Sequence, residues 1–261
     1  MALFNHSTFI GIDPTAGEKP FSYAALDQDL RLLALGSGSM DEVLAFTAGQ
    51  RQAVVAVCSP RQPNQGIMSK REVRQSLSPM PSSGRWMNFR LCDYLLRQHH
   101  ITIPQTPANV EDCSQWMQNG FLLFRRLSDL GYGYYPVEGA DRQMLEVYPH
   151  SAFAVLLGVL PFQKNSLEGR IQRQLILHEQ RVNIPDPMRI FEEITRYRFL
   201  KGMLALDDLL STGELDALVG AYTAWKAVTS PDQVILLGDE QEGQIALPGA
   251  LKETYDAGVN P

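Results

Sequence analysis

The chain has 261 residues, of which 44% are apolar and 20% charged, and its 23 basic and 29 acidic side chains give a net charge of −6. This composition is typical of a globular protein and excludes collagen, coiled coils and disordered chains. The negative total argues against a protein that coats nucleic acid through bulk positive charge, although the basic residues gather in residues 51–97 and 164–201, where they could hold an anion.

The sequence contains no sign of a membrane or secreted protein. No stretch approaches the roughly 20 consecutive apolar residues of a membrane span, and the first residues lack the basic flank and apolar core of a signal peptide. The three cysteines, Cys58, Cys92 and Cys113, are spaced too widely for a Cys-x-x-Cys zinc motif or a disulfide framework. We therefore expect a cytoplasmic protein with free thiols and no membrane partner.

The first part of the chain predicts mostly strands. The apolar and β-branched runs that indicate them are residues 7–13, 21–26, 31–35 and 53–58. The first run ends at Asp13, before the turn former Pro14, and the first three together predict an antiparallel meander. Residues 39–49 predict a helix with Ser39 as its N-cap. The last run is apolar throughout, as in a strand that is covered on both faces.

The second part predicts mostly helices. Residues 59–84 are rich in proline and serine and predict a long loop. The later segments are helices over residues 90–99, 113–130, 151–157 and 211–228, a strand over 144–148, and a final hairpin of 233–238 and 243–248. Residues 164–201 predict one or two charged amphipathic helices, broken at Pro185 and Pro187. Ser211 with Glu214 indicates a capping box at the start of the last helix.

This order of elements predicts an α/β fold built on a mixed sheet, with a three-stranded antiparallel meander continued by parallel strands. We expect one domain over residues 1–261. Within it, residues 59–142 and 164–201 are expected to be insertions of helices and loops.

Three carboxylates stand out by their positions: Asp13 at a strand end, Glu146 near the end of a later strand, and Asp216 in the first turns of the last helix. Active sites of α/β sheets lie at strand ends. If the three converge, they call for a hard cation such as Mg²⁺ or Mn²⁺, and two such ions can cleave a phosphodiester. Taken singly, they are better explained by structural roles, Asp13 as a turn former, Glu146 as a salt-bridge partner and Asp216 as an acid favoured by the helix dipole.

Other residues are candidates for supporting roles. Arg85 and Arg90 lie in a basic segment and could contact phosphates, while Arg90 and Asp93 could equally form a local ion pair. His150 lies close to Glu146 and could transfer protons. The aromatic residues that could stack on bases or pack in the core are Trp86, Phe89 and Trp116. The motifs of P-loop NTPases, zincins and common serine hydrolases are absent.

Several pieces of the chain resemble a known family. Residues 9–13 are similar to the opening strand of RNase H-like domains, including Holliday-junction resolvases. More of the chain resembles the domain of unknown function 429 family, described as predicted RNase H-like nucleases, in residues 11–13, 54–60, 90–93, 146–149, 216–224 and 243–248. The resemblance implies an RNase H-like mixed sheet with helices on both faces and a metal-binding carboxylate cluster. Its candidate members here are Asp13, Glu146 and Asp216.

One position departs from the pattern of that family, which usually has an aspartate where this chain has Cys58. A thiolate is a poor ligand for Mg²⁺. The leading hypothesis is a metal-dependent RNase H-like nuclease in which Arg85, Arg90 and residues 61–84 steer nucleic acid. The alternative is a non-catalytic nucleic-acid or ligand-binding protein with a degenerate site. A third hypothesis treats residues 13–17 as the phosphate-binding turn of an actin- or sugar-kinase-like phosphotransferase.

Overall fold

The computed structural model describes residues 7–17, 19–78, 80–81, 84–204 and 206–256. The backbone of Arg85 is among them, but its side chain lies outside the described part.

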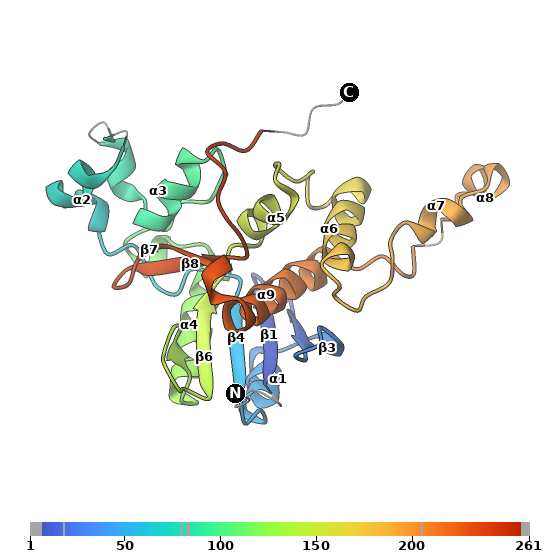
Figure 1. Ribbon diagram of the computed structural model, residues 1–261, viewed down its shortest axis with the longest axis horizontal. Helices are drawn as coiled ribbons and strands as arrows, with labels where there is room; N and C mark the ends of the chain where they lie inside the picture. Colours follow the sequence, from blue (N-terminus) through green and yellow to red (C-terminus); the bar gives the residue numbers. More distant parts are fainter. Residues whose placement is uncertain (1–6, 18, 79, 82–83, 205, 257–261) are drawn as a thin grey trace.

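In the described residues, eight strands form one mixed sheet in the order β3-β2-β1-β4-β6-β8-β7, and β5 pairs with β6 beside that path (Figure 1). The strands are β1 (Thr8–Asp13), β2 (Phe21–Leu26), β3 (Leu32–Gly38), β4 (Ala53–Val57), β5 (Gly133–Tyr134), β6 (Arg142–Glu146), β7 (Ile235–Asp239) and β8 (Gly243–Leu247). The first three form the antiparallel meander, and β1, β4, β6 and β8 run parallel. β7 closes the sheet as an antiparallel hairpin with β8.

Helices cover both faces of the sheet. On one face, α5 (Pro149–Leu157), α6 (Leu167–Glu179) and α9 (Thr212–Thr229) enclose a core that includes Phe9 and Val54. On the other, α1 (Met40–Ala48) and α4 (Gln115–Asp129) pack on Ile10 and Val55. Neighbouring residues of β1 and β4 thus enter opposite cores, as the two-residue repeat of a strand requires. A strand buried on both faces must be apolar throughout, which explains the composition of β4.

The remaining helices are α2 (Arg71–Ser76), α3 (Leu91–Gln98), α7 (Arg189–Glu193) and α8 (Arg196–Leu200). Of these, α3 packs against β7 and β8 at one end of the sheet, and the other three are peripheral. The helices α7 and α8 lie between α6 and α9 in the chain, and Figure 1 shows them extending away from the sheet. The side chains of Tyr197, Phe199 and Leu200 in α8 are exposed.

The predicted fold class is confirmed, and so are both predicted helix caps. Ser39 and Ser211 each accept a hydrogen bond from a backbone N–H three residues on, and the glutamate at that position returns one, which completes a capping box. Part of residues 59–84 differs from the predicted loop, because α2 forms there next to a small cluster around the buried Met68. Residues 164–201 contain three helices rather than one or two.

None of the described helices is long and apolar enough to cross a membrane.

Candidate functional site

A cavity of about 720 Å³ opens at the carboxyl ends of β1 and β4, beside the first turns of α9. Its walls come from distant parts of the chain. Asp13 is the last residue of β1, and the others lie on helices: Trp116 on α4, His150 on α5, Arg173 on α6 and Asp216 on α9. Strand ends in α/β sheets are the usual place for a binding site, because the loops that leave them are free to carry side chains.

Two of the predicted carboxylates, Asp13 and Asp216, line this cavity. Asp216 is 4% exposed, and its Oδ2 accepts a hydrogen bond from Lys164 Nζ at 3.0 Å. The carboxylate of Asp13 receives no hydrogen bond from any described residue. Burial, then repulsion by Asp216, raises the pKa of Asp13 well above its usual range, although Lys164 opposes the shift. Burial also raises the pKa of Asp216 against the attraction of Lys164 and Arg173.

Close packing of α9 on β1 brings the two carboxylates together. A Cβ atom on Gly11 would lie 1.8 Å from the backbone oxygen of Ala217, so only glycine permits this approach. On the helix side, a Cβ on Gly220 would lie 3.2 Å from Cys58 Sγ and 3.4 Å from Gly11 Cα. The helix can therefore place Asp216 over the end of the strand that carries Asp13.

Cys58 lies beside the two acids but offers little to a metal. Its thiol is buried and donates a hydrogen bond to the backbone oxygen of Asp216 at 3.3 Å. Burial, and then the charges of Asp13 and Asp216, raises the pKa of this thiol well above its usual range. Cys58 therefore stays protonated and helps to fix α9 rather than serving as a thiolate ligand.

Basic side chains line the same cavity. Attraction to Asp216 raises the pKa of Lys164. Arg173 is 2% exposed, and its Nη1 donates to the backbone oxygen of Gly169 at 2.9 Å, which fixes its orientation. Burial, followed by repulsion from Arg173 and Lys164, lowers the pKa of His150 to about 4. At neutral pH this imidazole is therefore uncharged.

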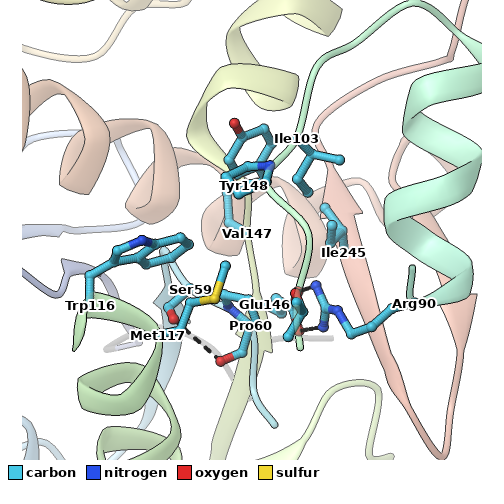
Figure 2. Close-up of a pocket in the computed structure, with 12 residues that line it drawn as sticks. Ser59, Pro60, Arg90, Ile103, Trp116, Met117, Glu146, Val147, Tyr148 and Ile245 are labelled. Atoms are coloured by element: carbon cyan, nitrogen blue, oxygen red, sulfur yellow. Dashed lines mark hydrogen bonds and ion pairs between the residues drawn. The ribbon is translucent and has the colours of Figure 1, made fainter. Parts of the chain in front are cut away.

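The third predicted carboxylate, Glu146, lies in a separate ion pair. Arg90 donates from Nη1 to Glu146 Oε2 at 3.0 Å and from Nη2 to Oε1 at 2.6 Å. The same guanidinium contacts both oxygens of Asp93, and the backbone N–H of Arg61 donates to Glu146 Oε2 at 3.0 Å. Figure 2 shows this pair together with Trp116, around a small cavity of about 10 Å³. Arg90 is 0% exposed, so its charge serves Glu146 and Asp93 rather than a ligand in the large cavity.

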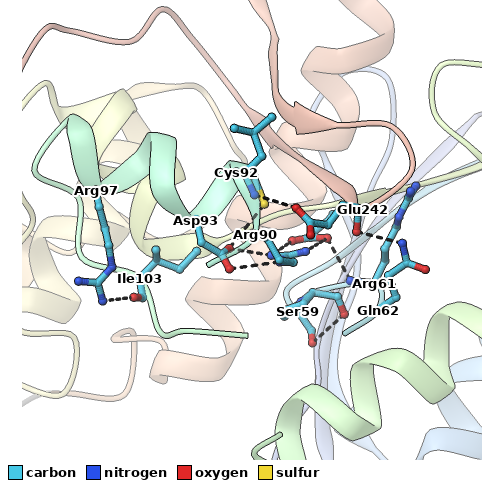
Figure 3. Close-up of polar contacts among 12 residues, drawn as sticks. Ser59, Arg61, Gln62, Arg90, Cys92, Asp93, Arg97, Ile103 and Glu242 are labelled. Carbon is cyan, nitrogen blue, oxygen red and sulfur yellow. Dashed lines mark hydrogen bonds and ion pairs between the residues drawn. The ribbon is translucent and has the colours of Figure 1, made fainter. Parts of the chain in front are cut away.

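Another acid, Glu242, extends this network and was not predicted from the sequence. Its carboxylate accepts hydrogen bonds from the backbone N–H groups of Gln65 at 3.0 Å and Leu91 at 2.8 Å. Figure 3 shows Glu242 close to Arg90, where the turn between β7 and β8 meets the start of α3. The network therefore ties three segments together, the loop after β4, α3 and the final hairpin.

The structure thus brings Asp13 and Asp216 together and places Glu146 and Arg90 in a structural ion pair. The side chain of Arg85 lies outside the described residues. Lys164 and Arg173 were not singled out by the sequence analysis, where the only signal was the basic character of residues 164–201.

Within the described residues, no group of three or more His, Cys, Asp or Glu side chains is arranged to hold a metal ion. Mg²⁺, however, is commonly bound by one or two carboxylates, with waters and substrate phosphates as the other ligands. The hard oxygen donors of Asp13 and Asp216 fit one such ion. They do not fit a pair of ions, because Glu146 is engaged by Arg90 and position 58 is a protonated thiol.

Comparison with known proteins places the chain in a family. The family model described as "Protein of unknown function (DUF429)" matches residues 11–242, so the chain belongs to this family. No curated protein and no solved structure matches the chain.

Proposed function

We propose that this DUF429 protein is a phosphodiesterase that acts on nucleic acid and depends on a divalent cation held by Asp13 and Asp216. The observation that carries the proposal is the pairing of these carboxylates in one cavity, where Lys164 alone forms an ion pair with either of them among the described residues. Burial raises the pKa of both acids, and repulsion by Asp216 raises that of Asp13 further, so ionising both together is costly, and a divalent cation removes that cost.

The surrounding side chains suit the phosphate of a substrate. Lys164 and Arg173 are placed to bind phosphate oxygens, and the buried Arg173 presents its fixed guanidinium without further ordering. His150 lines the same cavity and is uncharged at neutral pH, so its ring nitrogens can exchange hydrogen bonds with a bound water or substrate. A bound Mg²⁺ or Mn²⁺ would supply a Lewis acid that polarises a phosphoryl oxygen. The RNase H-like arrangement of the sheet supports the same reaction class by analogy alone.

A second candidate function is non-catalytic binding of a nucleic acid or another anionic ligand on the same fold. Two observations favour it: a buried thiol, Cys58, lies beside the two acids in place of a third carboxylate, and Glu146 is neutralised by Arg90. Such a protein would retain the basic cavity but would not hydrolyse what it binds.

A cleavage assay with labelled single-stranded DNA, single-stranded RNA and duplex DNA, with and without Mn²⁺, separates the two functions. The nuclease proposal predicts manganese-dependent cleavage that falls about 100-fold or more in Asp13→Asn and Asp216→Asn. Glu193→Gln, which alters an exposed acid outside the cavity, serves as the matched control and should leave the rate unchanged. Binding without cleavage would support the second function, and equal cleavage by the wild type and Asp13→Asn would refute the proposed site.

A further inference from the structure

We infer that the cavity accepts a single unpaired nucleotide, the terminal nucleotide of a single strand, rather than a paired segment of a duplex. This inference rests on the proposed function, because it specifies the substrate of the same site. It follows from the size of the cavity, the position of its charges and the position of its aromatic side chains.

The size of the cavity matches a small ligand. Its volume of about 720 Å³ lies inside the range of roughly 300–1,000 Å³ that is typical of small-molecule sites. Both acids line this space, and Asp216, which is 4% exposed, is paired there with Lys164. A base that is stacked and paired in a duplex must leave the stack before it can enter a pocket of this kind. An unpaired nucleotide enters without that cost.

The charges of the cavity provide one end for a phosphate. Three cationic side chains line it, Lys19, Lys164 and Arg173, against the two acids Asp13 and Asp216. With three cationic side chains against two acids, the lining carries an excess of positive charge. That excess suits a phosphate monoester or the phosphate at the end of a strand.

The aromatic residues of the cavity provide a surface for a base. Trp116, Tyr148 and Phe162 all line it, and Phe162 is 47% exposed although it is a large apolar side chain. The indole N–H of Trp116 donates no hydrogen bond to any described residue, so it is available to a ligand. Tyr148, in contrast, is fixed, since its hydroxyl donates to the backbone oxygen of Thr102 at 3.2 Å. Aromatic faces of this kind stack on bases with little preference for sequence.

Calorimetric titration of the metal-free protein tests the inference, with AMP, ribose 5-phosphate and inorganic phosphate as probes. We expect AMP to bind at least about tenfold more tightly than the two probes without a base, because only AMP gains base stacking. In Trp116→Leu the affinity for AMP should fall about tenfold while that for inorganic phosphate stays unchanged, and Trp116→Phe should restore most of the loss. Equal affinities for AMP and phosphate, or an unchanged AMP affinity in Trp116→Leu, would overturn the inference.

The failure of this inference is distinguishable from the failure of the proposed function. Manganese-dependent cleavage that needs Asp13, together with no preference for AMP over phosphate, would retain the nuclease and reject the nucleotide pocket. Binding of AMP that depends on Trp116, together with no cleavage of any strand, would retain the pocket and reject the nuclease. Trp225→Phe is the control for the tryptophan substitutions, because Trp225 lies on α9, stacked on Tyr222 and outside the cavity lining.

Discussion

Replacing Glu146 by glutamine tests whether this residue is a structural partner or a member of the reactive site. The substitution keeps the shape of the side chain but removes the charge that faces Arg90. It also replaces one of two acceptor oxygens by a donor, while Arg90 Nη1, Arg90 Nη2 and the backbone N–H of Arg61 all point at that group. At least one donor must then face another donor in the protein interior.

The expected loss of stability follows from the burial of the Arg90–Glu146 ion pair. The side chains of Arg90 and Glu146 are 0% and 3% exposed, and removing one partner of a buried ion pair costs about 3–5 kcal/mol. The loss of one charge-assisted hydrogen bond, at about 1.5–3 kcal/mol, accounts for a large part of this. For a chain of this length, a change of 1 kcal/mol moves the melting temperature by roughly 2 °C. Glu146→Gln should therefore lower the melting temperature by about 6–10 °C.

Urea and thermal unfolding monitored by circular dichroism measure the effect. Glu193→Gln is the matched control, because Glu193 also pairs with an arginine, at 3.2 Å, but both side chains are nearly half exposed. Exposed pairs contribute about 1 kcal/mol or less, so this variant should melt within about 2 °C of the wild type. If Glu146→Gln were as stable as the wild type or more stable, as is common when a strained functional carboxylate is removed, the structural role of Glu146 would be refuted.

Three further predictions concern the cavity and the packing that forms it. Gly11→Ala should destabilise the fold by about 3 kcal/mol or more in urea unfolding, because its methyl group would displace α9, whereas Gly49→Ala, where a Cβ meets only ordinary contacts, should be nearly neutral. Cys58→Asp should strengthen Mn²⁺ binding about tenfold in a calorimetric titration by adding a third carboxylate, and an unchanged affinity would show that position 58 does not face the cation. The pKa of His150 is about 4 in the folded state against 6.5 in the unfolded state. The unfolded state therefore binds a proton first as the pH drops from about 6.5 to about 4, and the free energy of unfolding falls over this range by up to about 3 kcal/mol. His150→Gln should flatten that part of the stability curve, and a curve that keeps the wild-type slope would contradict the assignment.

The parts of the fold that were predicted from the sequence are those that depend on local patterns. The run of five apolar residues in β4 and the capping boxes at Ser39 and Ser211 are signals that a few neighbouring residues carry. The short helix α2 was not predicted. The segment before it is held by packing of Met68 against Phe89 and Tyr94, which come later in the chain, so no local pattern indicates the helix.

The candidate site was predictable only where position in the fold fixes a residue. Asp13 closes the first strand, and Asp216 belongs to a helix whose small residues indicate a close approach to the sheet, so their meeting follows from the topology. The environment of Glu146 does not follow from the topology, because its partner Arg90 is 56 residues earlier in the chain. Lys164 likewise precedes its partner Asp216 by 52 residues. Pairings at such separations are set by the packed structure rather than by any local pattern.

Titration of the protein with Mn²⁺, with the free ion followed by electron paramagnetic resonance, tests the central claim most directly. The account predicts one bound ion per chain in the wild type and in Glu146→Gln, measured below the melting temperature of the variant. Binding should be lost in Asp13→Asn and in Asp216→Asn, and it should release protons, because the raised pKa values of the two acids must be overcome. Unchanged binding in Asp13→Asn, or binding that is lost only in Glu146→Gln, would contradict the account.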